Sequence, residues 1–250
     1  MSIDVDRVYL SGHSIGGDAA WDIGLAHPDL WAGMIPIVAV ADKYVKHSYR
    51  ENGEYLPMYF VCGERDGNKL SLNADEWDHY LLHNNNSDVM IVQYQGRGHE
   101  DFHDEIQNLF TWMNLHKRNF FPKKFTVYSL RPSDKFFWWI ETDKPLDTNV
   151  ILPVEWGSKT ARAAKTVGTI NPTNGVSVDR STQKATVWLS PEMVSFDKPV
   201  TVSIDNRKKT NIQPSVPTLL EDVRTRGDRQ HPFWAKVESE NTGKRGASAQ

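Results

Sequence analysis

The sequence has a single cysteine, Cys62, among its 250 residues. One thiol cannot form an internal disulfide, and its place in an apolar, strand-like run predicts a buried, unreactive side chain. There is also no apolar run of the roughly 18 residues that a membrane-spanning helix needs. The first residues, Met1–Asp6, show no signal-peptide pattern, although this leaves the cellular compartment of a longer parent protein open. The formal net charge of -3 shows no excess of either sign, so neither a nucleic-acid partner nor a membrane anchor is expected.

What the sequence does have is a glycine-rich motif close to its start. Gly12-His13-Ser14-Ile15-Gly16 fits G-x-S-x-G and lies between a short apolar run and a helix-like segment. In that context the pattern is typical of a nucleophile elbow, in which small residues allow a sharp turn that exposes the serine hydroxyl. Ser14 is therefore a candidate nucleophile, and the backbone N–H of Ile15 is a candidate oxyanion-hole donor at the helix start. Alone, the same motif is also a common structural turn before a helix.

A candidate acid and a candidate base follow the serine. Asp66 lies in a turn just after one apolar run, and His99 lies just after another, between residues that let the chain bend. A serine hydroxyl is a weak nucleophile until an imidazole takes its proton and a carboxylate orients that imidazole. Because acid and histidine follow the serine in this order, we expect Ser14, Asp66 and His99 to form a catalytic triad, with Glu64 as a substitute acid. The alternative is that Asp66 and His99 are ordinary loop residues.

A zinc-binding pattern overlaps the candidate base. Residues 99–103, with the sequence HEDFH, satisfy H-E-x-x-H, in which two histidines one helical turn apart bind zinc. That motif needs the middle of a long helix, whereas the glycines before His99 place it at a helix start. Leu109 occupies the position of the third histidine in the extended motif. A zinc metallopeptidase therefore remains a minor alternative, and we expect no metal and no cofactor.

The first part of the chain, up to about Arg118, alternates short apolar runs with longer amphipathic segments. This alternation predicts an α/β fold with a parallel sheet and flanking helices. The runs that are short, β-branched and bounded by turn residues predict strands at Arg7–Ser11, Gly33–Val38, Met58–Cys62 and Val89–Tyr94. The amphipathic segments predict helices at Ile15–His27, Leu72–His83 and Asp101–His116.

The pattern changes after Phe121-Pro122. Short β-forming runs are separated by Pro, Asn, Asp and Gly, which predicts a small antiparallel β domain. Its expected strands are Thr126–Leu130, Phe136–Glu141, Val150–Trp156, Ala185–Leu189 and Val200–Ile204, with a short helix at Leu219–Arg226. We therefore expect the α/β domain at residues 1–121, a β-sandwich-like domain at 122–212, a C-terminal extension at 213–238 and a disordered tail at 239–250. The aromatic residues Trp138, Trp139, Trp156 and Trp188 could stack on a carbohydrate, although core packing is the more common use of such residues.

With these motifs in view, residues 1–118 resemble the second half of an α/β-hydrolase domain. The resemblance is to the prolyl-oligopeptidase-like, dienelactone-hydrolase-like and feruloyl-esterase-like serine hydrolases, and it rests on GHSIGG at 12–17, GERD at 63–66 and GRGH at 96–99. It implies Ser14 as nucleophile, Asp66 as orienting acid and His99 as base, acting on small esters or peptides without a cofactor. Strands that precede the elbow in this family, with the second oxyanion donor, are missing here. We therefore expect a fragment of a longer gene, or a chain completed by a partner, with an unpaired edge on its first strand.

Two classes of function follow from these features. The first is a serine hydrolase, an esterase or a peptidase, working through an acyl-Ser14 intermediate. The second is a non-catalytic remnant or a module that binds a polysaccharide or a protein.

Overall fold

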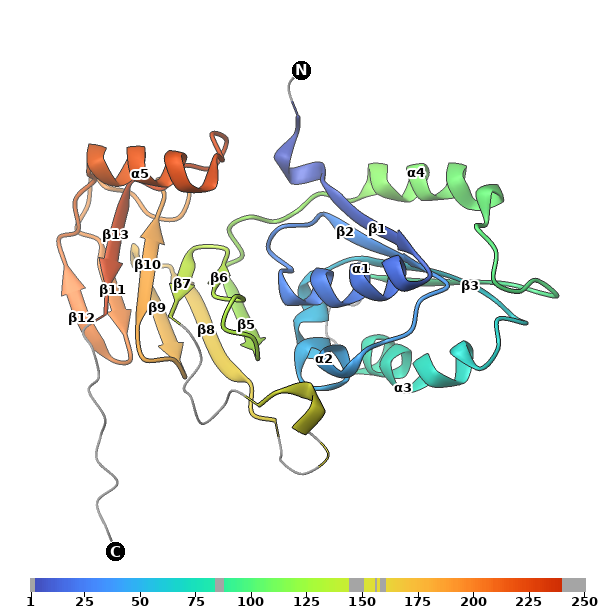
Figure 1. Ribbon diagram of the computed structural model, residues 1–250. Helices are drawn as coiled ribbons and strands as arrows, with labels where there is room; N and C mark the ends of the chain where they lie inside the picture. Colours follow the sequence, from blue (N-terminus) through green and yellow to red (C-terminus); the bar gives the residue numbers. More distant parts are fainter. Residues whose placement is uncertain (1–2, 84–87, 144–150, 156, 158–160, 240–250) are drawn as a thin grey trace, which may run out of the picture. The chain divides into compact units, whose positions relative to one another are not determined.

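The structure is a computed structural model, and it describes residues 3–83, 88–143, 151–155, 157 and 161–239. These residues belong to two compact units, Met1–Asn119 and Phe120–Gln250. Figure 1 shows the helices and strands of both units. Among the described residues, no helix has the length and apolar character required to span a bilayer.

The first unit contains a sheet of four strands, each parallel to its neighbours. The strands are β1 (Tyr9–His13), β2 (Gly33–Ile37), β3 (Met58–Gly63) and β4 (Val89–Tyr94). Their order in the sheet, β1-β2-β3-β4, is their order in the chain, so β1 and β4 are its outer strands. The carboxyl ends of all four strands therefore meet at one edge of the sheet, where the segments that follow β1, β3 and β4 carry the candidate site residues.

Helices cover both faces of this sheet (Figure 1). They are α1 (Ile15–Ala26), the short α2 (Lys43–Lys46), α3 (Lys69–Leu82) and α4 (Ile106–Leu115). Right-handed crossovers between strands that follow one another place the connecting helices on a single face, which α1 and α3 occupy. The helix α4 follows the last strand and covers the opposite face.

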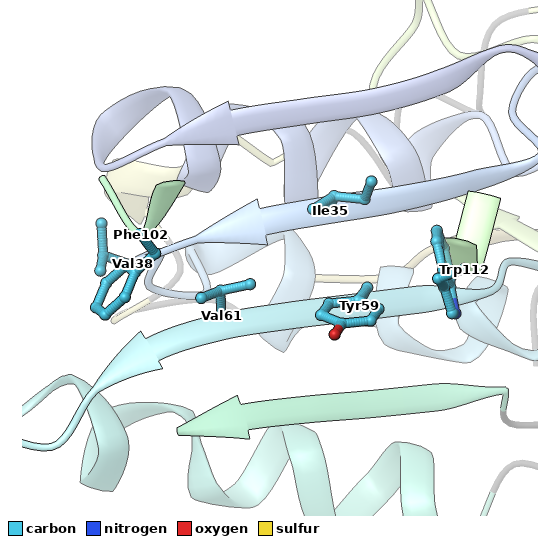
Figure 2. Close-up of a cluster of buried hydrophobic side chains, with 6 residues drawn as sticks. All are labelled: Ile35, Val38, Tyr59, Val61, Phe102 and Trp112. Atoms are coloured by element: carbon cyan, nitrogen blue, oxygen red, sulfur yellow. The ribbon is translucent and has the colours of Figure 1, made fainter. Parts of the chain in front are cut away.

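Successive residues of a β-strand point to opposite faces of the sheet, so alternate side chains pack against the helices on each face. On one side, the α4 residue Trp112 packs against Tyr59 and Ile35, in the cluster that Figure 2 shows. On the other side, Phe60 lies against Trp21 of α1, with ring centroids 4.6 Å apart. The indole N–H of Trp21 donates to the Tyr80 hydroxyl of α3 over 3.0 Å, so both helices are fixed to the sheet by one buried aromatic group.

Two helix starts differ from the sequence prediction. The helix α3 begins at Lys69, three residues before the predicted Leu72, and this brings Lys69 to the edge of the sheet. The helix α4 begins at Ile106, not at the predicted Asp101. Phe102 has a left-handed backbone, with φ of 51°, and residues His103–Glu105 form a 3-10 helix, η3, so a regular helix starts only after them.

The second unit contains two sheets, which Figure 1 labels. The five-stranded sheet has the order β12-β11-β9-β8-β5, and the four-stranded sheet has the order β13-β10-β7-β6. The strands of the first are β5 (Lys124–Ser129), β8 (Ala164–Asn171), β9 (Gly175–Arg180), β11 (Thr201–Ile204) and β12 (Arg207–Thr210). The strands of the second are β6 (Phe136–Phe137), β7 (Ile140–Thr142), β10 (Ala185–Leu189) and β13 (Ala235–Glu238).

The prediction of a wholly antiparallel β domain is wrong at one pair of strands. The other strand pairs among the described residues of this unit are antiparallel, but β9 and β11 run parallel, with Val176 beside Val202. The intervening strand β10 belongs to the other sheet, so the chain crosses between sheets and returns in the same direction. The predicted strand Val150–Trp156 is also wrong where the structure describes it, because Pro153–Glu155 form a 3-10 helix; residues 150 and 156 lie outside the described residues.

The segment predicted as a C-terminal extension contributes to the second unit. It supplies the helix α5 (Val216–Arg226) and the strand β13, which pairs with β10. The Ser215 hydroxyl caps α5 by accepting from the N–H of Thr218, and Gly227 ends the helix with φ of 67°. The predicted disordered tail falls mostly on residues 240–250, which lie outside the described residues.

Aromatic side chains form much of the core of the second unit. Trp138 and Trp139 are 2% and 0% exposed, and both contact Phe125, with ring centroids 4.5 and 5.3 Å away. Trp188 is 7% exposed. These three indoles are therefore largely buried, as core packing predicts. Trp156, the fourth of the set, lies outside the described residues.

Candidate active site

The motif around Ser14 forms a sharp turn between β1 and α1. Ser14 has φ of 56° and ψ of -123°, a conformation that non-glycine residues rarely adopt and that costs about 1–3 kcal/mol. Its N–H donates to the carbonyl oxygen of Ile37 at the end of β2, over 2.9 Å, which fixes the turn to the neighbouring strand. The turn therefore has the strained geometry expected of a nucleophile elbow.

Two glycines make this turn sterically feasible. A Cβ atom at Gly12 would lie 1.9 Å from the carbonyl oxygen of Gly16, and one at Gly17 would lie 2.8 Å from that of Ile37. Gly16 itself is different, because no atom beyond its chain neighbours and the nearby backbone of α1 lies within 4 Å of the position of its Cβ. Of these three glycines, only Gly12 and Gly17 lie so close to other main-chain atoms that a larger residue would clash.

The first turn of α1 supplies N–H groups beside Ser14. The N–H groups of Gly17 and Asp18 donate to the Ser14 carbonyl oxygen, over 2.8 and 3.0 Å. Ile15 is the first residue of the helix, so its N–H has no helical acceptor, and its side chain is 82% exposed. The structure thus places the Ile15 N–H at the positive end of the helix dipole, next to the serine.

Asp66 and His99 lie together at the same edge of the sheet. Asp66 follows β3, and its carboxylate is largely buried, with 10% of the side chain exposed. The Nδ1 atom of His99 lies 3.0 Å from Oδ1 and 3.1 Å from Oδ2 of Asp66. The structure therefore brings together the acid and the base that the sequence predicts, although they are 33 positions apart in the chain.

The two loops that carry this pair are joined by their main chains. The N–H of Arg65 donates to the carbonyl oxygen of Arg97 over 2.8 Å. A Cβ atom at Gly63 would lie 2.3 Å from the carbonyl oxygen of Gly98, so only glycine allows this approach. Glu64, the substitute acid of the sequence prediction, binds the N–H of Gly96 over 2.6 Å. Its carboxylate therefore holds the loop, and Asp66 is the carboxylate beside the imidazole.

His13 is a further site residue, which sequence reasoning missed. Its ring contacts that of His99 edge-on, with centroids 5.2 Å apart, and its Nε2 lies 2.9 Å from the carbonyl oxygen of Glu100. Because His13 directly precedes Ser14, this contact brings the His99 loop to the elbow. No hydrogen bond joins Ser14 Oγ to His99 in the described part of the chain. Such catalytic hydrogen bonds are often long in free enzymes and shorten when substrate binds.

Lys69 is the second residue that sequence reasoning missed. Its Nζ donates to the carbonyl oxygen of Val38 over 2.5 Å and lies 3.2 Å from Oδ2 of Asp66. It also lies 3.2 Å from Nδ1 of His99. The sequence places Lys69 three residues after Asp66, and this spacing could have indicated that the two side chains are close. It does so only if α3 begins early enough to include Lys69, whereas the predicted helix began at Leu72.

The segment HEDFH does not have the geometry of a zinc-peptidase motif. His99 lies in a loop and His103 in η3, so the two are not one turn apart on a helix. The Glu100 carboxylate pairs with the Arg97 guanidinium over 2.8 Å. The described residues contain no group of three or more His, Cys, Asp or Glu side chains that could hold a metal ion. The zinc alternative is therefore not supported by the arrangement of these residues.

A buried carboxylate, Glu105, fixes the end of the segment that follows β4 and carries His99. Glu105, only 3% exposed, accepts hydrogen bonds from the hydroxyl groups of Tyr59 and Tyr94. Burial acts to raise the pKa of Glu105, but the hydrogen bonds, led by the one from Tyr59, outweigh it, so the pKa is lower than usual. The same contact with Glu105 raises the pKa of Tyr94 to about 12. The end of the loop is thus tied to both β3 and β4.

The single thiol lies close to Asp66 and is buried. Cys62 is 6% exposed and lies near the carboxyl end of β3, an inner strand of the sheet. Burial, assisted by the Asp66 carboxylate, raises the pKa of the Cys62 thiol to about 11. Because the thiolate is the nucleophilic form, this raised pKa makes Cys62 a weaker candidate nucleophile than an ordinary thiol.

Comparisons with known proteins give matches among solved structures. No protein-family model matches the chain, and no curated protein does. A thermostable esterase shares 21% identity, over 46% of this chain and 32% of its own, with a TM-score of 0.37. Acyl-protein thioesterase 2 from Zea mays shares 14% identity over 42% of this chain and 54% of its own, with a TM-score of 0.34. S-formylglutathione hydrolase (FrmB) from Staphylococcus aureus shares 17% identity over 45% and 54%, with a TM-score of 0.36.

The chain thus covers about a third to about half of the length of these solved structures. With TM-scores below 0.4 and identities of 21% or less, we infer the function from the geometry of the site itself.

Proposed function

We propose that the first unit carries the acyl-transfer site of a serine hydrolase of the α/β-hydrolase type, acting on carboxylic esters. One observation carries this proposal. A carboxylate–imidazole pair, Asp66 and His99, lies at the sheet edge where Ser14 is held in a strained turn between strand and helix. Each of the three residues follows a different parallel strand, so only the folded chain assembles the group.

The residues would act in the following roles. The Asp66 carboxylate accepts from Nδ1–H of His99 and so leaves a lone pair on Nε2. Nε2 takes the proton of the Ser14 hydroxyl as Oγ forms a bond to the carbonyl carbon of the ester. The electron pair of the carbonyl bond moves to its oxygen, where the Ile15 N–H donates a hydrogen bond.

The intermediate then collapses to an acyl enzyme. The carbon–oxygen bond of the ester breaks, and His99 gives its proton to the departing alcohol. Water repeats the sequence: His99 takes its proton, the hydroxide oxygen bonds to the acyl carbon, and Oγ of Ser14 leaves with the proton returned. A carboxylic acid is released, and the site is restored.

A second oxyanion donor would come from outside the turn. The strand β1 is an outer strand of the sheet, and Ser14 follows its last residue. We propose that a further segment or a partner chain adds along this edge and brings a main-chain N–H beside the elbow. Because one such donor contributes about 10²–10³ in rate, we expect slow turnover by this chain alone.

The test is covalent labelling of the full chain with a fluorophosphonate probe, read by intact mass. Such a probe forms a bond to an activated serine and needs no complete turnover. We expect one adduct on the wild type, none on Ser14→Ala, and one on the control Ser203→Ala, which changes a serine of β11 in the other unit. An unlabelled wild type that is folded by circular dichroism would contradict the proposal and favour a non-catalytic role.

The substrate class has its own measurement. We expect p-nitrophenyl acetate to be hydrolysed by the wild type above the rate of Ser14→Ala, and the matched acetyl p-nitroanilide to be hydrolysed more slowly. The reason is that an amide nitrogen leaves less readily than a phenolate. Equal or faster cleavage of the anilide would instead indicate a peptidase.

A further inference from the structure

A cavity of about 200 Å³ lies in the second unit, where residues of its two sheets come together. The strands β9, β11 and β12 of the five-stranded sheet supply most of its lining, and β13 of the other sheet supplies Val237 and Glu238 (Figure 1). The Nζ atom of Lys209 donates to the carbonyl oxygen of Glu238 over 2.9 Å, which ties β12 to β13, the outer strands of their sheets. The cavity has room for a small organic molecule, since about 150 Å³ is enough for benzene.

The register of β11 and β12 directs two cationic side chains to this cavity. In an antiparallel pair, residues that lie opposite each other point to the same face of the sheet. Arg207 is opposite Ile204, and Lys209 is opposite Val202. Val202 and Ile204 are 1% and 5% exposed, so they are on the covered face. Arg207 and Lys209 therefore extend from the same face as the buried residues of β11, and all four line the cavity.

A third cationic side chain, that of Arg180, is buried at the same cavity. Arg180 ends β9, two residues after the buried Val178 and on the same face, and only 3% of its side chain is exposed. Its guanidinium donates to the carbonyl oxygen of Thr182 and lies 3.2 Å from Oδ2 of Asp205. Its Nε–H has no hydrogen-bond partner among the described residues. Arg180 thus keeps one buried donor for which the described part of the chain supplies no acceptor.

The charges around the cavity favour an anion. Four cationic side chains and two carboxylates line it. The Glu238 carboxylate lies 3.0 Å from the ammonium group of Lys236, which is not part of the lining, and the Asp205 side chain is 36% exposed to water. The positive charge is therefore not cancelled within the cavity. A guanidinium group also presents its N–H donors in a planar fork that matches a carboxylate.

Protection of the sheet edge explains only part of this arrangement. Charged residues on an outer strand, such as Arg207 and Lys209 of β12, commonly prevent pairing between sheet edges. Arg180, however, is on β9, which lies two strands in from that edge. Burial of a guanidinium is unfavourable unless its donors are paired. An anion in the cavity would supply the acceptor that the Nε–H of Arg180 lacks.

We propose that this cavity binds a small amphipathic anion, a carboxylate attached to a short apolar or aromatic group. The carboxylate lies at the guanidinium groups of Arg180 and Arg207, and the apolar part lies against Val202, Ile204 and Val237. This site belongs to the second unit and does not depend on the function proposed for the first.

The test is binding of benzoate to the full chain with ¹³C-labelled isoleucine methyl groups, followed by NMR. We expect the methyl signal of Ile204, assigned by its loss in Ile204→Val, to shift to saturation with a Kd below about 1 mM. The methyl signal of Ile91, in β4 of the first unit, should stay in place. No saturable shift of the Ile204 signal up to about 10 mM benzoate would overturn the proposal.

Two other small molecules separate the charge from the ring. Benzamide has the shape of benzoate without its charge, and acetate has the charge without the ring. Because the site is proposed to bind both parts of the ligand, each should bind at least about tenfold more weakly than benzoate. Benzamide that binds as tightly as benzoate would overturn the role of the cations, and acetate that does so would overturn the role of the apolar residues.

Variants of the cations test where the carboxylate is held. Arg180→Met should weaken benzoate binding by at least about tenfold, as loss of a charge-assisted hydrogen bond does. Since Arg180 is buried and its loss could disturb folding, Arg207→Gln, at an exposed position of β12, is a second variant with the same expected effect. Lys184→Gln, an exposed lysine of the same unit outside the cavity, is the matched control and should bind as the wild type does. Equal affinities of Arg207→Gln and Lys184→Gln would overturn the assignment of the site.

Discussion

The ring of His13 rests edge-on against the ring of His99, with 5.2 Å between centroids, and Nε2–H of His13 donates to the carbonyl oxygen of Glu100. The residue before Ser14 thus holds the loop that carries His99.

This contact predicts the effect of removing the imidazole at position 13. In His13→Ala the loop loses its tie to the elbow, so His99 samples positions away from Ser14. We expect labelling of Ser14 by a fluorophosphonate to slow by about tenfold, since mispositioned catalytic groups lose rate steeply. His103→Ala, which changes a 77% exposed histidine of the same segment, is the matched control and should label at the wild-type rate. Equal rates for the two variants would show that His13 does not position the base.

Substitutions of the two neighbouring carboxylates Asp66 and Glu64 should have very different effects on the rate of ester hydrolysis. Asp66→Asn replaces the acceptor at His99 Nδ1 with an amide that can stabilise the wrong tautomer, so we expect ester hydrolysis to fall by about 10⁴-fold. Glu64→Gln keeps an acceptor for the Gly96 N–H and should cost less than about tenfold. The comparison of kcat/KM with p-nitrophenyl acetate checks both. A larger loss in Glu64→Gln than in Asp66→Asn would reverse the assignment of the acid.

Gly12 and Gly16 of the elbow motif form a matched pair of positions for a test of folding stability. Gly12→Ala drives a methyl group into the main chain of Gly16, so we expect loss of several kcal/mol, or failure to fold, because backbone atoms cannot move aside. Gly16→Ala meets no atom within 4 Å beyond its chain neighbours and the nearby backbone of α1, and it lies inside this helix, where alanine is favoured over glycine by about 0.5–1 kcal/mol. Urea unfolding followed by far-ultraviolet circular dichroism measures both. A destabilised Gly16→Ala would show that the turn leaves no room for a methyl group at this position.

A buried carboxylate on α3 predicts a dependence of stability on pH. Glu76 is 2% exposed, and burial raises its pKa, an effect that the attraction of Arg50, 3.6 Å away, opposes but does not cancel. The folded-state pKa is thus above the unfolded value of about 4.3. The folded state keeps its proton longer, so stability is full below that value and declines as pH rises through the folded-state pKa.

Glu76→Gln removes this penalty because the amide is neutral at every pH. We expect the variant to melt at a higher temperature than the wild type at pH 7.5, with the difference shrinking as pH falls toward about 4. Asp78→Asn, an exposed carboxylate of the same helix, should change melting by little at either pH. A variant that melts lower than the wild type at pH 7.5 would show that the ion pair with Arg50 outweighs the burial of charge.

The sequence predicts the sheet of the first unit well because its strands are short and apolar. The strand Val89–Tyr94 has its predicted bounds, and Met58–Gly63 is one residue longer than predicted. The order of Ser14, Asp66 and His99 along the chain was enough to expect them at one sheet edge, because parallel strands share a direction. Their proximity in the structure agrees with that expectation, while their catalytic roles remain predictions.

Other features depend on contacts that no local pattern contains. The sequence of β8, Ala164–Asn171, shows only a weak alternation of apolar and polar residues and includes a glycine. Its pairing with β5 and β9 therefore decides its structure. The parallel pairing of β9 with β11 depends on β10 joining the other sheet. Lys69 was missed for a similar reason, since its approach to His99 requires both the early start of α3 and the bend of the loop after β4.

The close main-chain approach of Gly63 to Gly98 has a consequence for how this site could change over evolutionary time. The shape of the site is set by peptide groups and glycines, whereas its chemistry is set by a few side chains at the ends of loops. For the function proposed above, a single substitution at Ser14, Asp66 or His99 would abolish reactivity and leave the scaffold intact, but a substitution at Gly12 or Gly63 would damage the scaffold itself. A descendant that had lost the proposed activity would therefore keep this architecture, and its glycines would be the more durable record of the site.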